Sequence, residues 1–115
     1  MRNSKVVVKR ISDIIGMPTA HDIGVKKVLV SNTETDTSIT QIAYTTLSMG
    51  DAVEAHTHPT MDEHFIILTG TCSIVCGEDK YLIIPSSYIY VPAGVEHRIE
   101  ISEPLTMITI GIATE

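Results

Sequence analysis

The chain has 115 residues, a net charge of −6 at pH 7 and 43% hydrophobic residues, enough for one compact domain with one hydrophobic core. Such an acidic chain lacks the basic face that nucleic acids and anionic membranes attract, so we expect neither as a partner. The apolar stretches are strand-sized and far shorter than the roughly 20 residues of a membrane-spanning helix. Val6-Val7-Val8 is too short for the apolar region of a secretion signal, so we expect a cytoplasmic protein.

The first part of the chain precedes the main series of strands. We expect added strands over residues 5–9 and 25–30, with a short helical turn over 11–15. His21 lies in a polar stretch between them, and we expect its side chain to be solvated.

From residue 39 onward, β-branched and aromatic segments alternate with turn residues. The predicted strands cover residues 39–48, 53–58, 63–68, 72–76, 81–84, 88–91, 97–101 and 105–112. Strands of this length and spacing predict an all-β sandwich or barrel. A parallel α/β fold would need helices between its strands, and these intervals leave no room for them.

The two cysteines, Cys72 and Cys76, fall on one predicted strand. Four residues at about 3.3 Å each place them roughly 13 Å apart, whereas a disulfide needs Cα atoms closer than about 7 Å. No cation neighbours Cys72 to lower its pKa. We therefore expect packing roles for both thiols rather than redox chemistry or nucleophilic catalysis.

Two histidines and one glutamate form the first part of a candidate metal site. His56 and His58 are two residues apart, so on a strand their imidazoles share one face at a spacing of about 6.6 Å. Pro59 ends that strand, and Glu63 opens the next one with its carboxylate able to face back. His64 then points to the opposite side, and we expect it in packing or at an interface.

A third histidine lies further along the chain. A turn through Pro92 and Gly94 delivers His97 to the start of another strand. Three imidazoles and one carboxylate suit iron, manganese, nickel, cobalt or zinc better than calcium or magnesium, which prefer oxygen ligands. Four such ligands would leave one or two positions of an octahedron open to a substrate.

The spacing of these residues resembles the two motifs of the cupin superfamily. The first motif, Gly-x5-His-x-His-x3-4-Glu-x6-Gly, is matched at every position by Gly50, His56, His58, Glu63 and Gly70. The second, Gly-x5-Pro-x-Gly-x2-His-x3-Asn, is matched by Pro92, Gly94 and His97. The motifs span nearly half of the chain, and they specify a fold and a metal site but not a reaction.

The second motif departs from the family pattern at two positions. Ser86 stands where glycine is usual, and as a small residue it still suits a turn. Ile101 stands where asparagine is usual, which removes a polar side chain that would help to hold the loop. Neither position is a metal ligand in the family.

The resemblance implies a single domain over residues 1–115, a jelly-roll β-barrel with a core at about 38–113 and added N-terminal strands within 1–37. It implies one divalent transition metal per chain in the barrel mouth, held by His56, His58, Glu63 and His97. It also implies a homodimer, in which the added strands could cover or extend a sheet edge.

Two classes of function remain open. The first is a metal-dependent enzyme acting on a small molecule, such as a dioxygenase or an isomerase, and we favour it because open metal positions suit a substrate. The second is a barrel that binds a small ligand or senses a metal without turnover.

Strand parity limits the substrate. Ile99 and Ile101 share the side of His97, and Phe65 and Ile67 share the side of Glu63, so we expect an apolar wall beneath the metal. No lysine or arginine is expected to face the site, which disfavours phosphorylated sugars and favours an uncharged or singly anionic molecule. Hydrogen-bond donors to the substrate are sought among the tyrosines Tyr44, Tyr88 and Tyr90, and the residues predicted to contact it are Tyr44, Phe65 and Tyr90.

Overall fold

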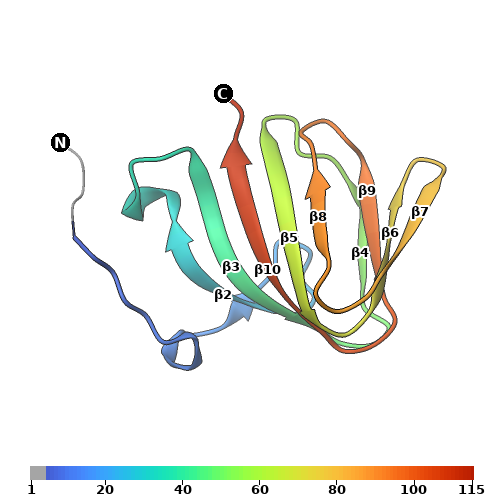
Figure 1. Ribbon diagram of the computed structural model, residues 1–115, viewed down its shortest axis with the longest axis horizontal. Coiled ribbons are helices and arrows are strands. Elements are labelled where there is room, and N and C mark those ends of the chain that lie inside the picture. Colours follow the sequence, from blue (N-terminus) through green and yellow to red (C-terminus); the bar gives the residue numbers. More distant parts are fainter. Residues whose placement is uncertain (1–4) are drawn as a thin grey trace.

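The computed structural model describes residues 5–115 and contains ten strands in two antiparallel sheets (Figure 1). The six-stranded sheet has the order β1-β2-β3-β10-β5-β8, and the four-stranded sheet has the order β4-β9-β6-β7. The larger sheet is built from β1 (Met17–Pro18), β2 (Val25–Ser31), β3 (Ile39–Leu47), β10 (Leu105–Ala113), β5 (Met61–Thr69) and β8 (Tyr88–Val91). The smaller is built from β4 (Ala52–His56), β9 (His97–Ile101), β6 (Cys72–Cys76) and β7 (Asp79–Ile83). The predicted all-β jelly-roll fold is confirmed.

The hydrophobic core lies between the inner faces of the two sheets. Alternation along the strands supplies it: on β5 the side chains of Phe65 and Ile67 are buried while Ile66 and Leu68 are exposed. On β9 the buried positions are His97, Ile99 and Ile101. The apolar wall predicted from parity is therefore present, and His97 is the one member of this row that brings a polar group into the core.

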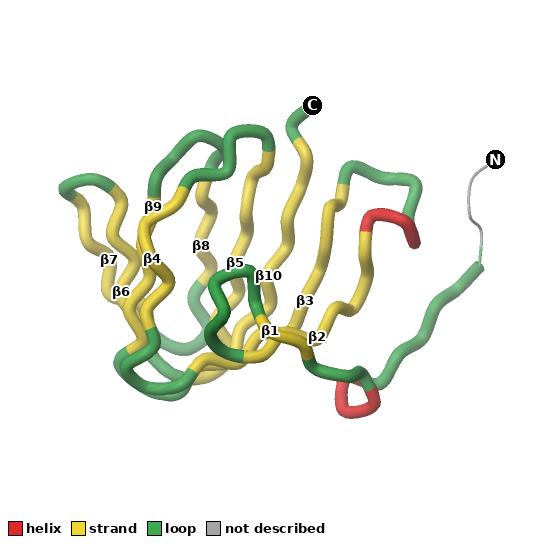
Figure 2. The backbone as a smooth tube through the Cα atoms, turned by 180° about the vertical axis from the view of Figure 1, so that it is seen from behind, coloured by secondary structure: helices red, strands yellow, loops and turns green. Residues whose placement is uncertain are grey.

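The N-terminal segment differs from its prediction. Residues 5–10 form no strand, and the side chains of Val6 and Val8 are 90% and 89% exposed. The helical turn is a 3-10 helix, η1 (Ile11–Asp13), and a second one, η2 (Asn32–Glu34), follows β2. Seen from behind in Figure 2, the described part of the chain before β1, from residue 5 onward, runs outside both sheets. The run of β-branched residues at 6–8 was not enough, because a strand also needs backbone pairing with a neighbouring strand.

Two turns at the end of β5 depend on left-handed backbone. Gly70 has φ +83°, and a Cβ there would meet the carbonyl carbon of Pro104 and the Cα of Leu105, each at 2.7 Å. Ser86 has φ +66°, so the serine that replaces the usual glycine adopts the conformation that glycine favours. Its backbone N–H donates to the Ile67 carbonyl at 2.8 Å, which ties this turn to β5.

Ile101 holds its loop through the backbone rather than through a polar side chain. Its N–H donates to the carbonyl of Asp51, and its own carbonyl accepts from the N–H of Gly50, both at 3.0 Å. The Ile101 side chain is buried in the core. The usual asparagine is thus dispensable for this connection.

The other expectations about segments concern thiols and membranes. Both cysteines are free, and they lie four residues apart on β6. Burial raises the pKa of the Cys72 thiol to about 11, so a thiolate is disfavoured there. Within residues 5–115, no helix has the length and apolarity needed to cross a membrane.

Candidate metal centre

Both sheets contribute to the cluster of predicted ligands. His56 ends β4 and is paired in register with His97, which begins β9 of the same sheet. His58 follows in the loop, and Glu63 projects from β5 of the opposite sheet. One ligand atom from each of the four residues lies within 4.8 Å of all the others. The fold thus brings together side chains that are 41 residues apart in the sequence, and these four could hold a metal ion.

The loop that delivers His97 is fixed to the other ligands. The N–H of Gly94 donates to the carbonyl of His58 at 2.8 Å, and the N–H of Ala93 donates to the Asp62 carboxylate at 2.8 Å. Gly94 has φ +84°, which glycine accommodates without strain. The turn residues of the second motif therefore dock directly on the segment of the first.

Two of the imidazoles are oriented by backbone carbonyls two residues earlier in the chain. Nδ1 of His56 lies 2.9 Å from the carbonyl oxygen of Glu54, and Nδ1 of His97 lies 3.0 Å from that of Val95. A carbonyl only accepts, so each Nδ1 is assigned the proton and donates. The lone pair of Nε2 is then directed into the cluster, which is the arrangement that a metal-ligating histidine needs.

Glu63 and His97 leave polar atoms that a cation would satisfy. Oε1 of Glu63 and Nε2 of His97 are buried and have no hydrogen-bond partner of good geometry, although they lie 3.2 Å apart. Oε1 is also 3.0 Å from Nε2 of His58. When the imidazoles are neutral, the lone pairs of these nitrogen and oxygen atoms face one another and repel. A cation bound between them would remove this repulsion. Adjacent ligand atoms around a metal with bonds near 2.1 Å are about 3 Å apart in an octahedron, so the donor set fits.

The same contacts shift the pKa values of the ligands in different directions. Burial favours the neutral form of Glu63, but the adjacent His97 ring, which donates to the carboxylate when it is protonated, and the charges of the neighbouring imidazoles prevail and lower its pKa. Burial also opposes charge on His97, yet Glu63 and the Val95 carbonyl raise its pKa above the ordinary value. For His56, burial prevails and the pKa is lowered. Glu63 is therefore held as a carboxylate, ready to bind a cation.

A cavity of about 350 Å³ opens above the four ligands. Phe65, predicted to contact the substrate, lines it together with Val53 and Ile99. Hydroxyl-bearing side chains add polar positions to the wall: Thr19, Thr40, Thr45 and Thr109. The site is thus a largely apolar pocket with polar groups at defined places, as in most small-molecule sites.

Two further residues of this cavity were not expected from the sequence. Lys26 lines it, so the prediction that no lysine faces the site is wrong. His21 is exposed as expected, but its ring packs on that of His56 with centroids 4.4 Å apart. Burial at this contact lowers the pKa of His21. Both come from the segment before β3, whose position depends on pairing with β3 rather than on local spacing.

The predicted tyrosines lie elsewhere. Among the described residues that line the cavity, Tyr44 and Tyr90 do not occur. Tyr90 pairs with His64 and stacks on its ring at 5.0 Å, and its hydroxyl donates to Asp62 at 3.3 Å. Tyr44 of β3 pairs with Ile108 of β10. On the other side of β10, Ile108 pairs with Ile66 of β5, whose side chain is exposed. Both tyrosines therefore share the outer face with His64, for which the prediction of an outward position is confirmed.

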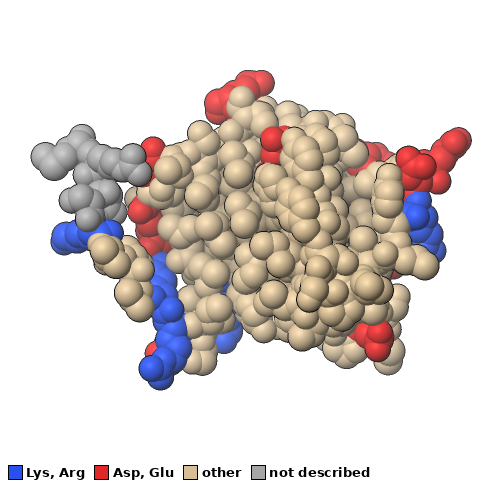
Figure 3. Space-filling view, viewed as in Figure 1, with Lys and Arg blue, Asp and Glu red and all other residues tan. Residues whose placement is uncertain are grey.

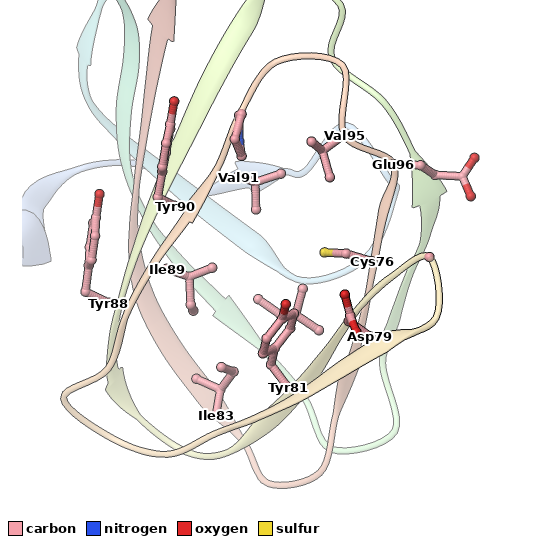
Figure 4. A pocket seen from close by; sticks show the side chains of 13 residues that line it. Cys76, Asp79, Tyr81, Ile83, Tyr88, Ile89, Tyr90, Val91, Val95 and Glu96 are labelled. Atoms are coloured by element: carbon pink, nitrogen blue, oxygen red, sulfur yellow. The ribbon is translucent and has the colours of Figure 1, made fainter.

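A second, larger hollow of about 710 Å³ lies between β8 and the β6–β7 hairpin (Figure 4). Aliphatic side chains, including Ile83, Ile89 and Val91, line it together with three tyrosines, one of which is Tyr90. Its thiol, Cys76, has a raised pKa because of burial and the charge of Asp79, so it is a poor nucleophile. Within the described chain its residues contribute nothing to a metal-binding group, and the smaller cavity is the candidate site.

Two antiparallel sheets that bring three imidazoles and one carboxylate together at one end define a jelly-roll barrel with a candidate metal site. A family model described as "Cupin domain" matches residues 43–111, more than half of the chain. The chain belongs to this family. The two observations agree with the motif spacing, because the matched segment contains all four ligands.

Known proteins share the fold more closely than the sequence. A predicted oxalate decarboxylase from Thermotoga maritima superposes with a TM-score of 0.84 at 20% identity, covering 93% of this chain and 99% of that one. Ectoine synthase from P. lautus gives 0.81 at 15% identity, covering 93% and 78%. The xanthan biosynthesis protein XanB of Xanthomonas campestris is 30% identical over 60 residues, which are 52% of this chain but 13% of XanB. The chain thus spans only a small part of that curated relative.

Proposed function

We propose that this protein is a metal-dependent cupin that acts on a small molecule, with one divalent transition metal bound by His56, His58, Glu63 and His97. The observation that carries the proposal is the pair of buried atoms, Glu63 Oε1 and His97 Nε2, which lack partners at the base of an open cavity. The nitrogen and oxygen donors suit iron, manganese, nickel, cobalt or zinc.

The chain's own residues prepare the site for a ligand. The backbone bonds to His56 and His97 hold both rings in place, so little reorganisation accompanies binding. Phe65 and Ile99 make the wall beneath the ligands apolar and limit the access of water. A divalent transition metal would supply Lewis acidity and open coordination positions there.

An enzyme of the dioxygenase or isomerase type is favoured over a binding module. The cavity opens directly on the donor cluster, so a small molecule can reach the metal while its remainder contacts Phe65. The fold neighbours include a predicted oxalate decarboxylase and an ectoine synthase. At 20% identity or less they support the shape of the barrel and leave the reaction to experiment.

The test is metal analysis followed by turnover. Purified protein should contain close to one transition metal per chain, and after loading with iron(II) it should consume oxygen in the presence of a particular substrate if it is a dioxygenase. Conversion of a substrate without oxygen uptake would favour an isomerase. A compound that raises the melting temperature and is recovered unchanged would favour the binding module, and wild-type protein that never binds a metal would overturn the proposal.

We also propose a homodimer that forms through the outer face of the six-stranded sheet. Exposed apolar side chains gather there on β5 and β8, including Ile66, Leu68 and Tyr88. The middle of the face seen in Figure 3 carries few charged residues. Light scattering should give a dimer for the wild type and a monomer for Ile66→Glu, because a buried unpaired carboxylate is costly. A monomeric wild type at micromolar concentration would contradict this.

The cellular setting and the remaining partners follow from the same proposal. We place the protein in the cytoplasm, where the two free thiols remain reduced. Its net charge of −6 favours a small-molecule ligand over nucleic acid or an anionic membrane.

A further inference from the structure

Lys26 lies on the inner face of the six-stranded sheet. On β2 it is paired in register with Thr45 of β3, and both line the cavity above the metal ligands. Its neighbour Lys27 pairs with Tyr44 and belongs to the opposite face. One of these two adjacent lysines therefore faces the site and the other faces outward.

The ammonium of Lys26 is directed toward the level of Glu63. Its Nζ donates to Oε1 of Gln41 at 3.3 Å, and Gln41 is four residues from Thr45 along β3. Gln41 pairs with Gly111, which in turn pairs with Glu63. The Lys26 ammonium is thus held beside Gln41, which lies in one row across the sheet with Gly111 and Glu63. The backbones of β3 and β5 in this row are about 10 Å apart.

The position between them has no side chain of its own. Gly111 occupies it on β10, and a Cβ there would meet Thr40 and Met61, both of which line the cavity. A ligand between Lys26 and Glu63 would therefore lie over Gly111, with the Thr40 hydroxyl and the Met61 thioether beside it.

Lys26 has unused capacity to bind an anion. Its side chain is half-buried, and its hydrogen-bond partner is a neutral amide. Among the ion pairs formed by residues 5–115, none involves Lys26. An ammonium has three donors and is costly to remove from water without a counter-charge, so a carboxylate is a better partner than the amide.

We propose that Lys26 anchors a carboxylate of the ligand, whose other end reaches the metal through a second oxygen donor. The inference rests on the proposed function, because the second contact requires the metal. A carboxylate is favoured over a phosphate because this end of the cavity offers one ammonium, one amide and hydroxyls. Phosphate sites generally gather several backbone N–H groups or a bidentate arginine.

The experiment uses the full chain, metal-free and loaded with manganese(II), with metal content measured first. Malonate, succinate, glutarate and adipate are titrated calorimetrically, together with the monomethyl ester of the best binder and with glycerol 3-phosphate. The variants are Lys26→Met, which keeps the length of the side chain, Lys26→Arg, which keeps the charge, and Lys27→Met as the matched control on the opposite face.

In the expected result, one dicarboxylate binds the wild type about tenfold more tightly than its monoester, and Lys26→Met removes that preference without changing metal content. Lys26→Arg should restore the preference, and Lys27→Met should leave it unchanged. A wild type without metal would refute the proposed function, but the metal-free titrations would still measure the contribution of Lys26. Equal affinities in wild type and Lys26→Met, an equal loss in Lys27→Met, tighter binding of glycerol 3-phosphate or no binding of any dicarboxylate would each overturn the assignment to Lys26.

Discussion

The two ends of the barrel use motif residues for different purposes. At the end where β5 begins, Glu63, His58 and His97 crowd their polar atoms together around buried lone pairs. At the end where β5 stops, Gly70 and Ser86 make turns with positive φ that connect the sheets. The first arrangement is unfavourable for the metal-free chain, and the second lets the chain pass from one sheet to the other.

This difference indicates that binding and stability are separable in this protein. Substitutions at the ligand end should alter metal content with modest effects on folding, while substitutions at the turn end should do the reverse. Three substitutions and one change of pH test this separation.

Removal of His97 should abolish tight metal binding. His97→Ala deletes a ligand and leaves Glu63 beside a void, so we expect metal affinity to fall by at least about 100-fold. Atomic absorption on protein dialysed against free metal measures it. His64→Ala, on the outer face, should retain full metal content; equal metal content in both variants would show that the ligand assignment is wrong.

Replacement of Gly70 should destabilise the fold. Gly70→Ala forces a Cβ against the backbone of Pro104 and Leu105 in addition to the cost of positive φ, so we expect a loss of more than about 2 kcal/mol in the free energy of unfolding. Urea denaturation measures it. Gly77→Ala is the control, because Gly77 also has positive φ but nothing lies within 4 Å of its Cβ position. A similar loss in both variants would remove the role assigned to the close contact.

Metal affinity should fall in steps as the pH decreases. Protons compete for the imidazoles; the raised pKa of His97 makes this competition begin above pH 6.5, and the lowered pKa of His56 delays its contribution to below that value. Competition with a fluorescent chelator between pH 5 and 8 measures the profile. Affinity that stays constant over this range would argue against imidazole ligands.

Ser86→Gly should stabilise the protein slightly. Glycine accepts φ +66° without the steric cost that serine bears, and we expect a gain of about 0.5–1 kcal/mol after allowing for the freer unfolded chain. Thermal unfolding measures it, with metal content unchanged. Ser87→Gly lacks this advantage and should not stabilise; a gain there, or none at Ser86, would contradict the explanation.

The sequence predicted the parts of the site that depend on short-range spacing. A short loop separates His56 and His58 from the strand that carries Glu63. Strand parity alone predicts that Glu63 and His64 point to opposite faces of the sheet. Parity also predicted the apolar wall of Phe65 and Ile99. Spacing was sufficient for these residues because they lie close together in the sequence, whereas His97 was predicted from the second motif of the family resemblance.

Side-chain positions that depend on the register of pairing between strands could not be predicted from the sequence. The face that Lys26 presents depends on the register between β2 and β3, which shifts between Val28 and Val30. The same is true of Tyr44, whose outward position follows from its pairing with Ile108. Residues 5–9 contain a run of three valines but form no strand, and strand formation depends on backbone pairing that their own sequence does not reveal.

The bonds from Nδ1 of His56 and His97 to carbonyls two residues earlier have a consequence for protein design. Each ring is oriented by its own short segment, residues 54–56 and 95–97, without help from a separate carboxylate. The two segments could therefore be transferred together to another protein. Grafted onto two adjacent antiparallel strands of another scaffold in the same register, the two segments should carry their tautomers and ring directions with them.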